Sequence, residues 1–70
     1  MKEYAVVFEK APNNYAAYEP DLPGCVATGA TREQVEGNIR DAIHFHLDGL
    51  RLENLPIPEP SSWLETVAIS

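Results

Sequence analysis

Two prolines and a glycine stand together in one short stretch of this chain, residues 18–25, and restrict what it can fold into. The core of the stretch reads Pro20, Asp21, Leu22, Pro23, Gly24, Cys25. Each proline fixes one φ angle and removes a backbone donor, and the glycine permits conformations that other residues avoid, so no regular element can continue through it. Small, aromatic and β-branched residues at 15–18 and 25–28 flank it. The sequence therefore predicts two antiparallel strands joined by a rigid, acidic turn.

A further strand is predicted upstream, at residues 2–9, where apolar and polar positions alternate. Its apolar side chains fall on both sides, with Tyr4, Val6 and Phe8 on one and Ala5 and Val7 on the other. Turn-forming residues follow at 10–14, including one proline and two asparagines. Residues 2–18 are thus expected to form a hairpin, and the strand at 25–28 completes a three-stranded meander.

A helix is predicted to begin at Arg32, because Thr31 and Gln34 have the spacing of a capping box. At 100° per residue, one apolar stripe about 100° wide then runs along the helix. Its members are Val35, Ile39, Ala42, Ile43, His46 and Leu50. The helix is expected to end within residues 51–54, where Asn54 can take the left-handed conformation of a C-cap.

Proline at every second position of residues 55–60 excludes helix and predicts a stiff, extended strap that returns across the surface. A last strand is expected from Trp63 to Ile69. The chain is thus interpreted as one α+β domain, residues 1–70, with the order β-β-β-α-β. A right-handed crossover would give a four-stranded mixed sheet of order 3-2-1-4 with the helix on one face.

One helix covers only one face of such a sheet, and the second face also carries apolar residues such as Val7 and Tyr18. Because a chain of 70 residues has a small core, we expect another copy or a partner to bury that face. The sequence therefore predicts association with another copy, as a homo-oligomer, or with a partner.

The charge balance favours a protein partner over nucleic acid. Eleven acidic and five basic residues give a net charge of −6, and the basic residues form no stripe. An acidic surface suits a basic protein, although the same charge also serves solubility alone. The single cysteine cannot form an internal disulfide, and no apolar run approaches the roughly 20 residues that cross a bilayer. A cytoplasmic protein without a membrane segment is expected.

Two histidines and a cysteine are the first candidates for chemistry. His44 and His46 stand two apart on the predicted helix and point in nearly opposite directions, so they cannot share a metal ion. His44 is expected to be solvated and His46 to pack in the core. Cys25 has no histidine at a spacing that indicates a dyad, which favours a small buried residue over a reactive thiol.

Glu19 and Asp21 form the remaining candidate, a pair of carboxylates on the turn. Metal or acid–base chemistry would need further acidic residues converging on them, and no strand end supplies these. Solvated turn carboxylates, or contacts to a basic partner, are the preferred reading. The sequence predicts no catalytic residue, no metal site and no cofactor.

These motifs together resemble the HicB family over nearly the whole chain. The resemblance is carried by Tyr4-x-Val6-Val7-Phe8-Glu9, Pro20-Asp21-Leu22-Pro23-Gly24-Cys25, Ala27-x-Gly29-x-Thr31, and Leu55-Pro56-Ile57-Pro58-Glu59-Pro60. HicB proteins are antitoxins of bacterial and archaeal toxin–antitoxin pairs. The resemblance implies a truncated ribonuclease-H-like fold, dimers or tetramers, and binding to HicA, a small basic mRNA-cleaving toxin. Family members usually continue into a DNA-binding domain, whereas this sequence ends at Ser70, so no direct nucleic-acid binding is expected.

The predicted mechanism is inhibition by occlusion, in which acidic residues pair with basic residues of the toxin. The residues predicted for that contact are Glu19, Asp21, Glu53 and Glu59. An alternative is a solitary HicB-like oligomer with a regulatory or structural role and no toxin partner. A small enzyme acting on nucleic acid ranks below both, since the required acidic cluster cannot be assembled from this sequence.

Overall fold

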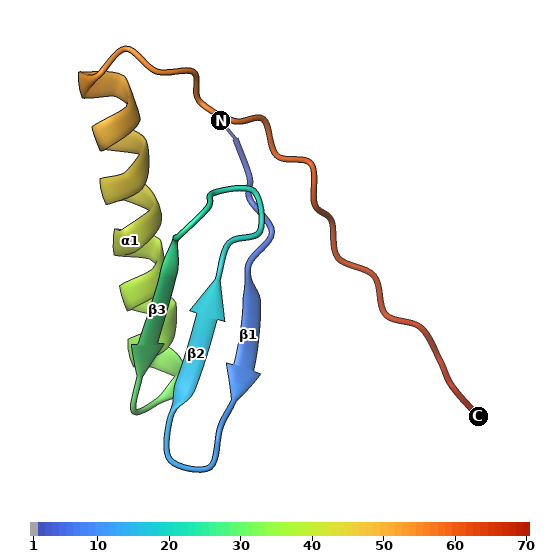
Figure 1. Ribbon diagram of the computed structural model, residues 1–70. Coiled ribbons are helices and arrows are strands. Elements are labelled where there is room, and N and C mark those ends of the chain that lie inside the picture. The colour runs from blue at the N-terminus through green and yellow to red at the C-terminus, as the bar shows by residue number, and fades with distance from the viewer. Residues whose placement is uncertain (1) are drawn as a thin grey trace.

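A computed structural model describes residues 2–70 and contains a three-stranded antiparallel sheet and one long helix (Figure 1). The elements are β1 (Val7–Lys10), β2 (Tyr15–Tyr18), β3 (Val26–Gly29) and α1 (Arg32–Leu52). The strands lie in the order β1-β2-β3, as a meander requires. The α+β class and the predicted sequence of three strands followed by a helix are confirmed.

The register separates two faces of the sheet. Phe8 lies opposite Ala17, and Ala17 lies opposite Ala27, so these side chains share one face. Ala17 is buried there beneath the helix. On the opposite face, Val7 pairs with Tyr18 and Tyr18 pairs with Val26, which forms an apolar row across all three strands. The helix leaves this row uncovered.

Both ends of α1 follow the local rules predicted from the sequence. The Thr31 hydroxyl accepts from the amide of Gln34 at 3.1 Å, and the Gln34 side chain reaches back to the amide of Ala30 at 3.0 Å. At the other end Asn54 has a φ of 55°, and its amide and that of Leu55 close a Schellman motif on the last helical turn. Within residues 2–70, no helix combines the length and the apolar character needed to span a bilayer.

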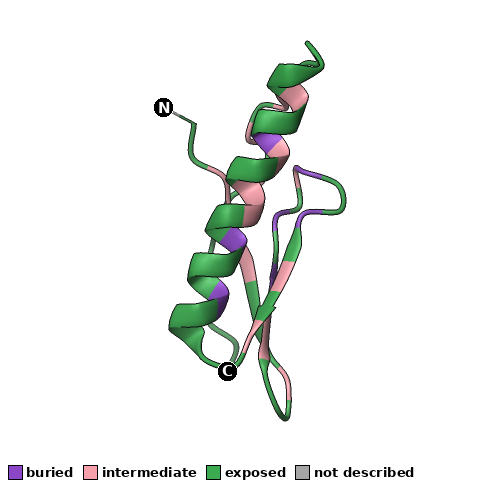
Figure 2. Cartoon of the chain, turned by 90° about the vertical axis from the view of Figure 1, so that its left-hand side faces the viewer, coloured by how far each residue is buried: buried purple, intermediate pink, exposed green. Residues whose placement is uncertain are grey.

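The helix lies over β3 and β2, and its buried residues lie along the side that faces the sheet (Figure 2). Val35 and Ile39 are buried as predicted, and the other predicted stripe members are half-buried. Leu47 is also buried, although it lies outside the predicted stripe. The reason is that Tyr4 and Ile57 pack against the core cluster from outside the sheet, which extends the buried face around the helix.

The strap at residues 55–60 returns from the end of α1 toward the beginning of the chain, as predicted (Figure 1). The Tyr4 hydroxyl donates to the carbonyl of Pro58 at 2.6 Å, and Lys2 pairs with Glu59 at 2.6 Å. These contacts fix the strap against the segment that precedes β1.

The structure differs from the predicted four-stranded sheet of order 3-2-1-4. Among residues 2–70 the sheet has three strands, and the segment from Trp63 to Ile69 pairs with none of them. After the strap, the chain leaves the domain and runs away from the sheet (Figure 1). The first strand is also shorter than predicted and begins at Val7, because its partner β2 ends at Tyr18, directly before the proline turn.

Candidate functional site

The turn at residues 19–25 is part of the core rather than a loop that projects from it. The amide of Glu19 donates to the carbonyl of Cys25 at 3.1 Å, and the amide of Cys25 donates to the carbonyl of Leu22 at 3.1 Å. Gly24 has a φ of 79°, a conformation that glycine adopts readily. Leu22 and Cys25 point inward and are buried. The sequence therefore builds a rigid turn whose own side chains help to form the core.

Asp21 holds the chain beyond the strap. Its carboxylate accepts four hydrogen bonds, two from Ser61 at 2.7 and 3.0 Å and two from Ser62 at 3.0 and 3.2 Å. The hydroxyl and the amide of Ser61 are the main causes that lower the pKa of Asp21 from 3.8 to about 2. The depressed pKa means that the contact favours the folded form above about pH 4 and is lost as the pH falls through about 2.

Glu19 is enclosed by its own chain. The residue is 2% exposed, and neither carboxylate oxygen has a hydrogen-bond partner. Burial is the main cause that raises the pKa of Glu19, and the charge of Asp21 acts in the same direction, while the amides of Asp21 and Leu22 oppose it. Glu19 was predicted for a partner surface, yet in this chain its carboxyl faces inward at the base of the turn.

We expect Glu19→Gln to raise the free energy of unfolding by about 1–2 kcal/mol at pH 7, because it removes a charge that is buried. A carboxyl with a raised pKa favours the folded form below its unfolded pKa, and that contribution is lost as the pH rises through the folded pKa. The gain from Glu19→Gln should therefore shrink toward pH 4. Urea unfolding at the two pH values measures it.

The matched control for Glu19 is Glu53→Gln, since the Glu53 side chain is exposed. That change should alter the free energy of unfolding by less than about 0.5 kcal/mol at either pH. A gain in Glu19→Gln that was equal at both pH values would contradict the assignment of the effect to a buried charge.

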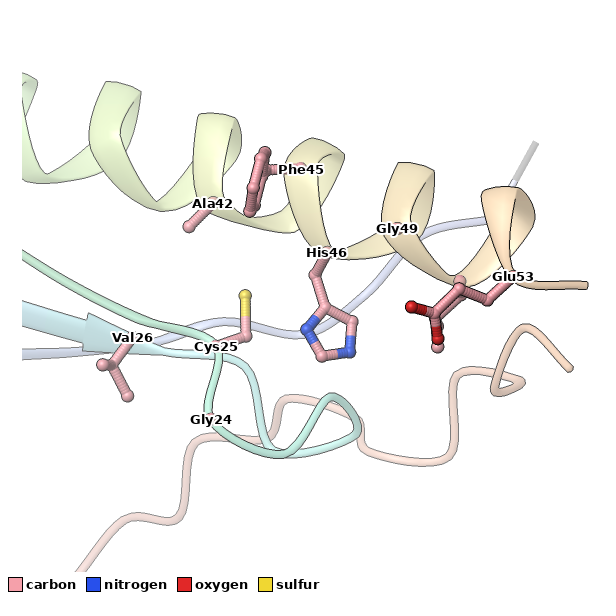
Figure 3. A pocket seen from close by; sticks show the side chains of 9 residues that line it. Gly24, Cys25, Val26, Ala42, Phe45, His46, Gly49 and Glu53 are labelled. Atoms are coloured by element: carbon pink, nitrogen blue, oxygen red, sulfur yellow. The ribbon is translucent and has the colours of Figure 1, made fainter. Parts of the chain in front are cut away.

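A shallow groove of about 450 Å³ lies between α1 and the turn (Figure 3). The lining residues are Gly24, Cys25, Val26, Ala42, Phe45, His46, Gly49, Leu50 and Glu53. His46 points from the helix toward the turn, between Cys25 and Glu53 (Figure 3). Phe45 is 83% exposed, whereas the Val26 side chain points away from the helix (Figure 3). The groove thus offers apolar side chains with a carboxylate at one end.

The two histidines and the cysteine show no sign of catalytic chemistry. His44 is exposed and His46 is half-buried. Cys25 is buried, and burial followed by the charge of Glu19 raises the pKa of its thiol, which keeps it protonated and unreactive at neutral pH. Among residues 2–70, no three histidine, cysteine, aspartate or glutamate side chains come together to hold a metal ion.

The other predicted contact residues differ in their surroundings. Glu53 stands at the end of α1, where its amide donates to the carbonyl of Gly49 at 3.2 Å and its side chain borders the groove. Glu59 is on the strap, with 79% of its side chain exposed and one oxygen paired with Lys2. Phe45 was missed by the sequence analysis. The available signal was a large aromatic residue outside the apolar stripe of the helix.

The fold and the groove define a small acidic domain: a three-stranded meander, one covering helix, and apolar side chains left open beside carboxylates. The family model described as the HicB-like antitoxin of bacterial toxin–antitoxin systems matches residues 4–69. The chain belongs to that family. This match confirms the family resemblance carried by the proline turn and the strap.

The chain is also similar to three other proteins of known sequence. The chain is 41% identical to a UPF0150 protein of Helicobacter pylori over 70% of this chain and 68% of that one. It is 31% identical to a UPF0150 protein of Thermoplasma acidophilum, over 89% and 90%. An uncharacterized 14.9 kDa protein of Haemophilus phage HP1 is 32% identical over 80% of this chain, which spans only 42% of the phage protein.

Among solved structures, a chain of the HicA3 and HicB3 toxin–antitoxin complex superposes with a TM-score of 0.70 and 29% identity. The superposition covers 84% of this chain and 69% of that chain.

Proposed function

We propose that this domain is an antitoxin that binds a small, basic, mRNA-cleaving HicA-type toxin and neutralises it by covering its active face. The observation that carries the proposal is the likeness to a chain of the HicA3 and HicB3 complex at a TM-score of 0.70. The net charge of −6 supports it, because an acidic domain attracts a basic partner and speeds their encounter. The proposed action is stoichiometric binding in the cytoplasm, where mRNA is found, without catalysis by this chain.

We assign the toxin contact to the groove between α1 and the turn. Interfaces concentrate affinity in exposed aromatic side chains that become buried, with charged residues at the rim. Phe45 supplies the apolar centre, and Glu53 supplies the charge at one end. The rigid turn and the capped helix hold these side chains in place before binding, which reduces the entropy lost on docking.

The remaining acidic residues act around this contact. Glu59 lies exposed on the strap and adds negative charge for a basic partner, while Asp21 is half-buried with its oxygens occupied by two serines. Glu19 is buried beneath the turn, so it would affect the contact only through the shape of the turn. A change at Asp21 would also release Ser61 and Ser62, so Glu53 gives the cleaner test of charge.

We expect Phe45→Ala to weaken binding of a HicA-type toxin about 30-fold, since it removes an aromatic side chain from the centre of the contact. Glu53→Lys should weaken binding about tenfold, mainly through slower association that depends on salt. Surface plasmon resonance with a purified HicA-type toxin measures both rates.

Glu33→Lys is the matched control, with the same charge reversal at an exposed position in the first turn of the same helix. It should leave the toxin affinity within about threefold of the parent. If Phe45→Ala and Glu53→Lys also bound the toxin like the parent, the contact would lie elsewhere on the domain. A parent protein that did not bind any HicA-type toxin would overturn the proposed function itself.

An oligomer with a regulatory or structural role is the second candidate. The observation that favours it is the apolar row of Val7, Tyr18 and Val26 on the uncovered face of the sheet, where Val26 is 66% exposed. Such a row is suited to pairing with another copy. We propose self-association as part of the antitoxin as well, so toxin binding is the measurement that separates the two candidates.

A further inference from the structure

The segment at residues 63–70 carries large apolar side chains that the rest of the chain leaves uncovered. Trp63, Leu64, Val67 and Ile69 are between 73% and 87% exposed. The side-chain hydrogen bond described for this segment is internal, from the Trp63 ring nitrogen to Glu65 at 2.8 Å. Both sides of the extended segment are mainly apolar, a pattern typical of a strand buried on both faces. The segment thus has the composition of a core strand without a sheet to enter.

The point at which this segment leaves the domain is fixed. Four hydrogen bonds from Ser61 and Ser62 hold the chain on Asp21, and the preceding strap is stiffened by alternating prolines. A short, stiff connection opposes folding back onto the same chain and favours exchange between copies. From Ser62 the segment runs outward, away from its own sheet (Figure 1).

The free edge of β1 is a suitable acceptor. β1 pairs with β2 along one edge, and its other edge has no partner strand in the described structure. The helix lies over β3 and β2 and does not contact β1. Phe8 is therefore 50% exposed on the helix side of the sheet. A small hollow of about 170 Å³ opens between Val6, which precedes β1, and Glu36, Ile39, Arg40 and Ile43 of the helix. An added strand would cover Phe8 and line this hollow.

We propose that two copies exchange residues 63–69, each segment pairing in parallel with β1 of the other copy. An extended segment of this length spans about 23 Å, more than the roughly 13 Å of the four residues of β1. Each copy buries four large side chains, which brings the shared surface to the order of 1,000 Å², the size that a specific interface needs. The exchange completes in the dimer the four-stranded sheet that a single chain lacks.

Trp63 is the single tryptophan of the chain and reports the exchange directly. The full chain is diluted through the micromolar range without toxin, and its tryptophan emission and light-scattering mass are followed together. The expected result is a dimer with blue-shifted emission at high concentration, with both signals reverting at the same midpoint. Val67→Lys should move that midpoint at least about tenfold toward higher concentration, because it places a charge inside the pairing. Leu52→Lys, at a helix position that is 85% exposed, should leave it unchanged.

Three outcomes overturn the exchange: blue-shifted emission in a monomer, a dimer in which Trp63 stays in water, or a monomer with exposed Trp63 at every concentration. The acceptor edge is tested by mixing copies labelled with different isotopes. Contacts between Val67 or Ile69 methyl groups and β1 amides of the other copy are expected, and contacts to a different strand would exclude β1. Because no toxin is present, these outcomes are independent of the proposed function.

Discussion

Gly29→Ala is expected to destabilise the domain by about 3 kcal/mol, a large part of the stability of a chain of this size. A methyl group at this position would lie 2.6 Å from the backbone nitrogen of Val35 and 3.0 Å from its Cα. Both atoms belong to the first turn of α1, so the clash cannot be relieved by rotating a side chain. The end of β3 and the start of the helix would have to move apart, and with them the packing of Val35.

Gly37→Ala is the matched control for this prediction. Apart from the neighbouring backbone of the helix itself, no atom lies within 4 Å of a methyl group at Gly37. Alanine favours the helix over glycine, so this change should stabilise the domain by about 0.5–1 kcal/mol. Thermal unfolding followed by circular dichroism measures both variants. A Gly29→Ala protein as stable as the parent would mean that the strand and the helix do not approach this closely.

Leu22→Ala should cost about 3 kcal/mol, since it empties the best-buried position of the proline turn. Leu22 is 1% exposed, and its cluster includes Ala17, Cys25 and Val35. The turn cannot collapse easily into the space, because two prolines and the backbone hydrogen bonds among Glu19, Leu22 and Cys25 hold its backbone. Denaturant unfolding of the parent and the variant gives the difference in free energy.

Leu52→Ala removes the same atoms from a site that is 85% exposed, and it should change the free energy of unfolding by less than about 0.5 kcal/mol. If the two leucine variants were equally stable, the turn would behave as a surface loop. The proposed contribution of the turn to the core would then be wrong.

Features set by a few neighbouring residues could be predicted from the sequence. The two prolines and Gly24 indicated the turn, Thr31 and Gln34 indicated the start of the helix, and Asn54 indicated its end. Each depends on backbone geometry or a hydrogen bond within one turn of the chain. Such constraints operate in any tertiary setting, which is why the structure retains them.

Features that depend on distant parts of the chain were not predictable in the same way. The anchoring of residues 61 and 62 by Asp21 joins positions 40 and 41 apart, and no local pattern marks it. The burial of Glu19 and of Leu47 depends on where the turn and the strap pack. Residues 63–69 have the pattern of a strand. They do not pair with their own sheet, because the connection at Ser61 and Ser62 directs them away from its free edge. At the candidate site, the acidic residues could be predicted from the sequence. The apolar groove could not, because Phe45 lines it only when the helix packs beside the turn.

The clasp between Asp21 and the two serines has a practical consequence for engineering. Because it links the first half of the polypeptide to the point where the last eight residues begin, a fluorophore or a second module fused after Ser70 would be tethered from one defined corner of the domain. Acidifying the sample toward the pKa of about 2 for Asp21 would protonate its carboxylate and weaken the contact with Ser61 and Ser62.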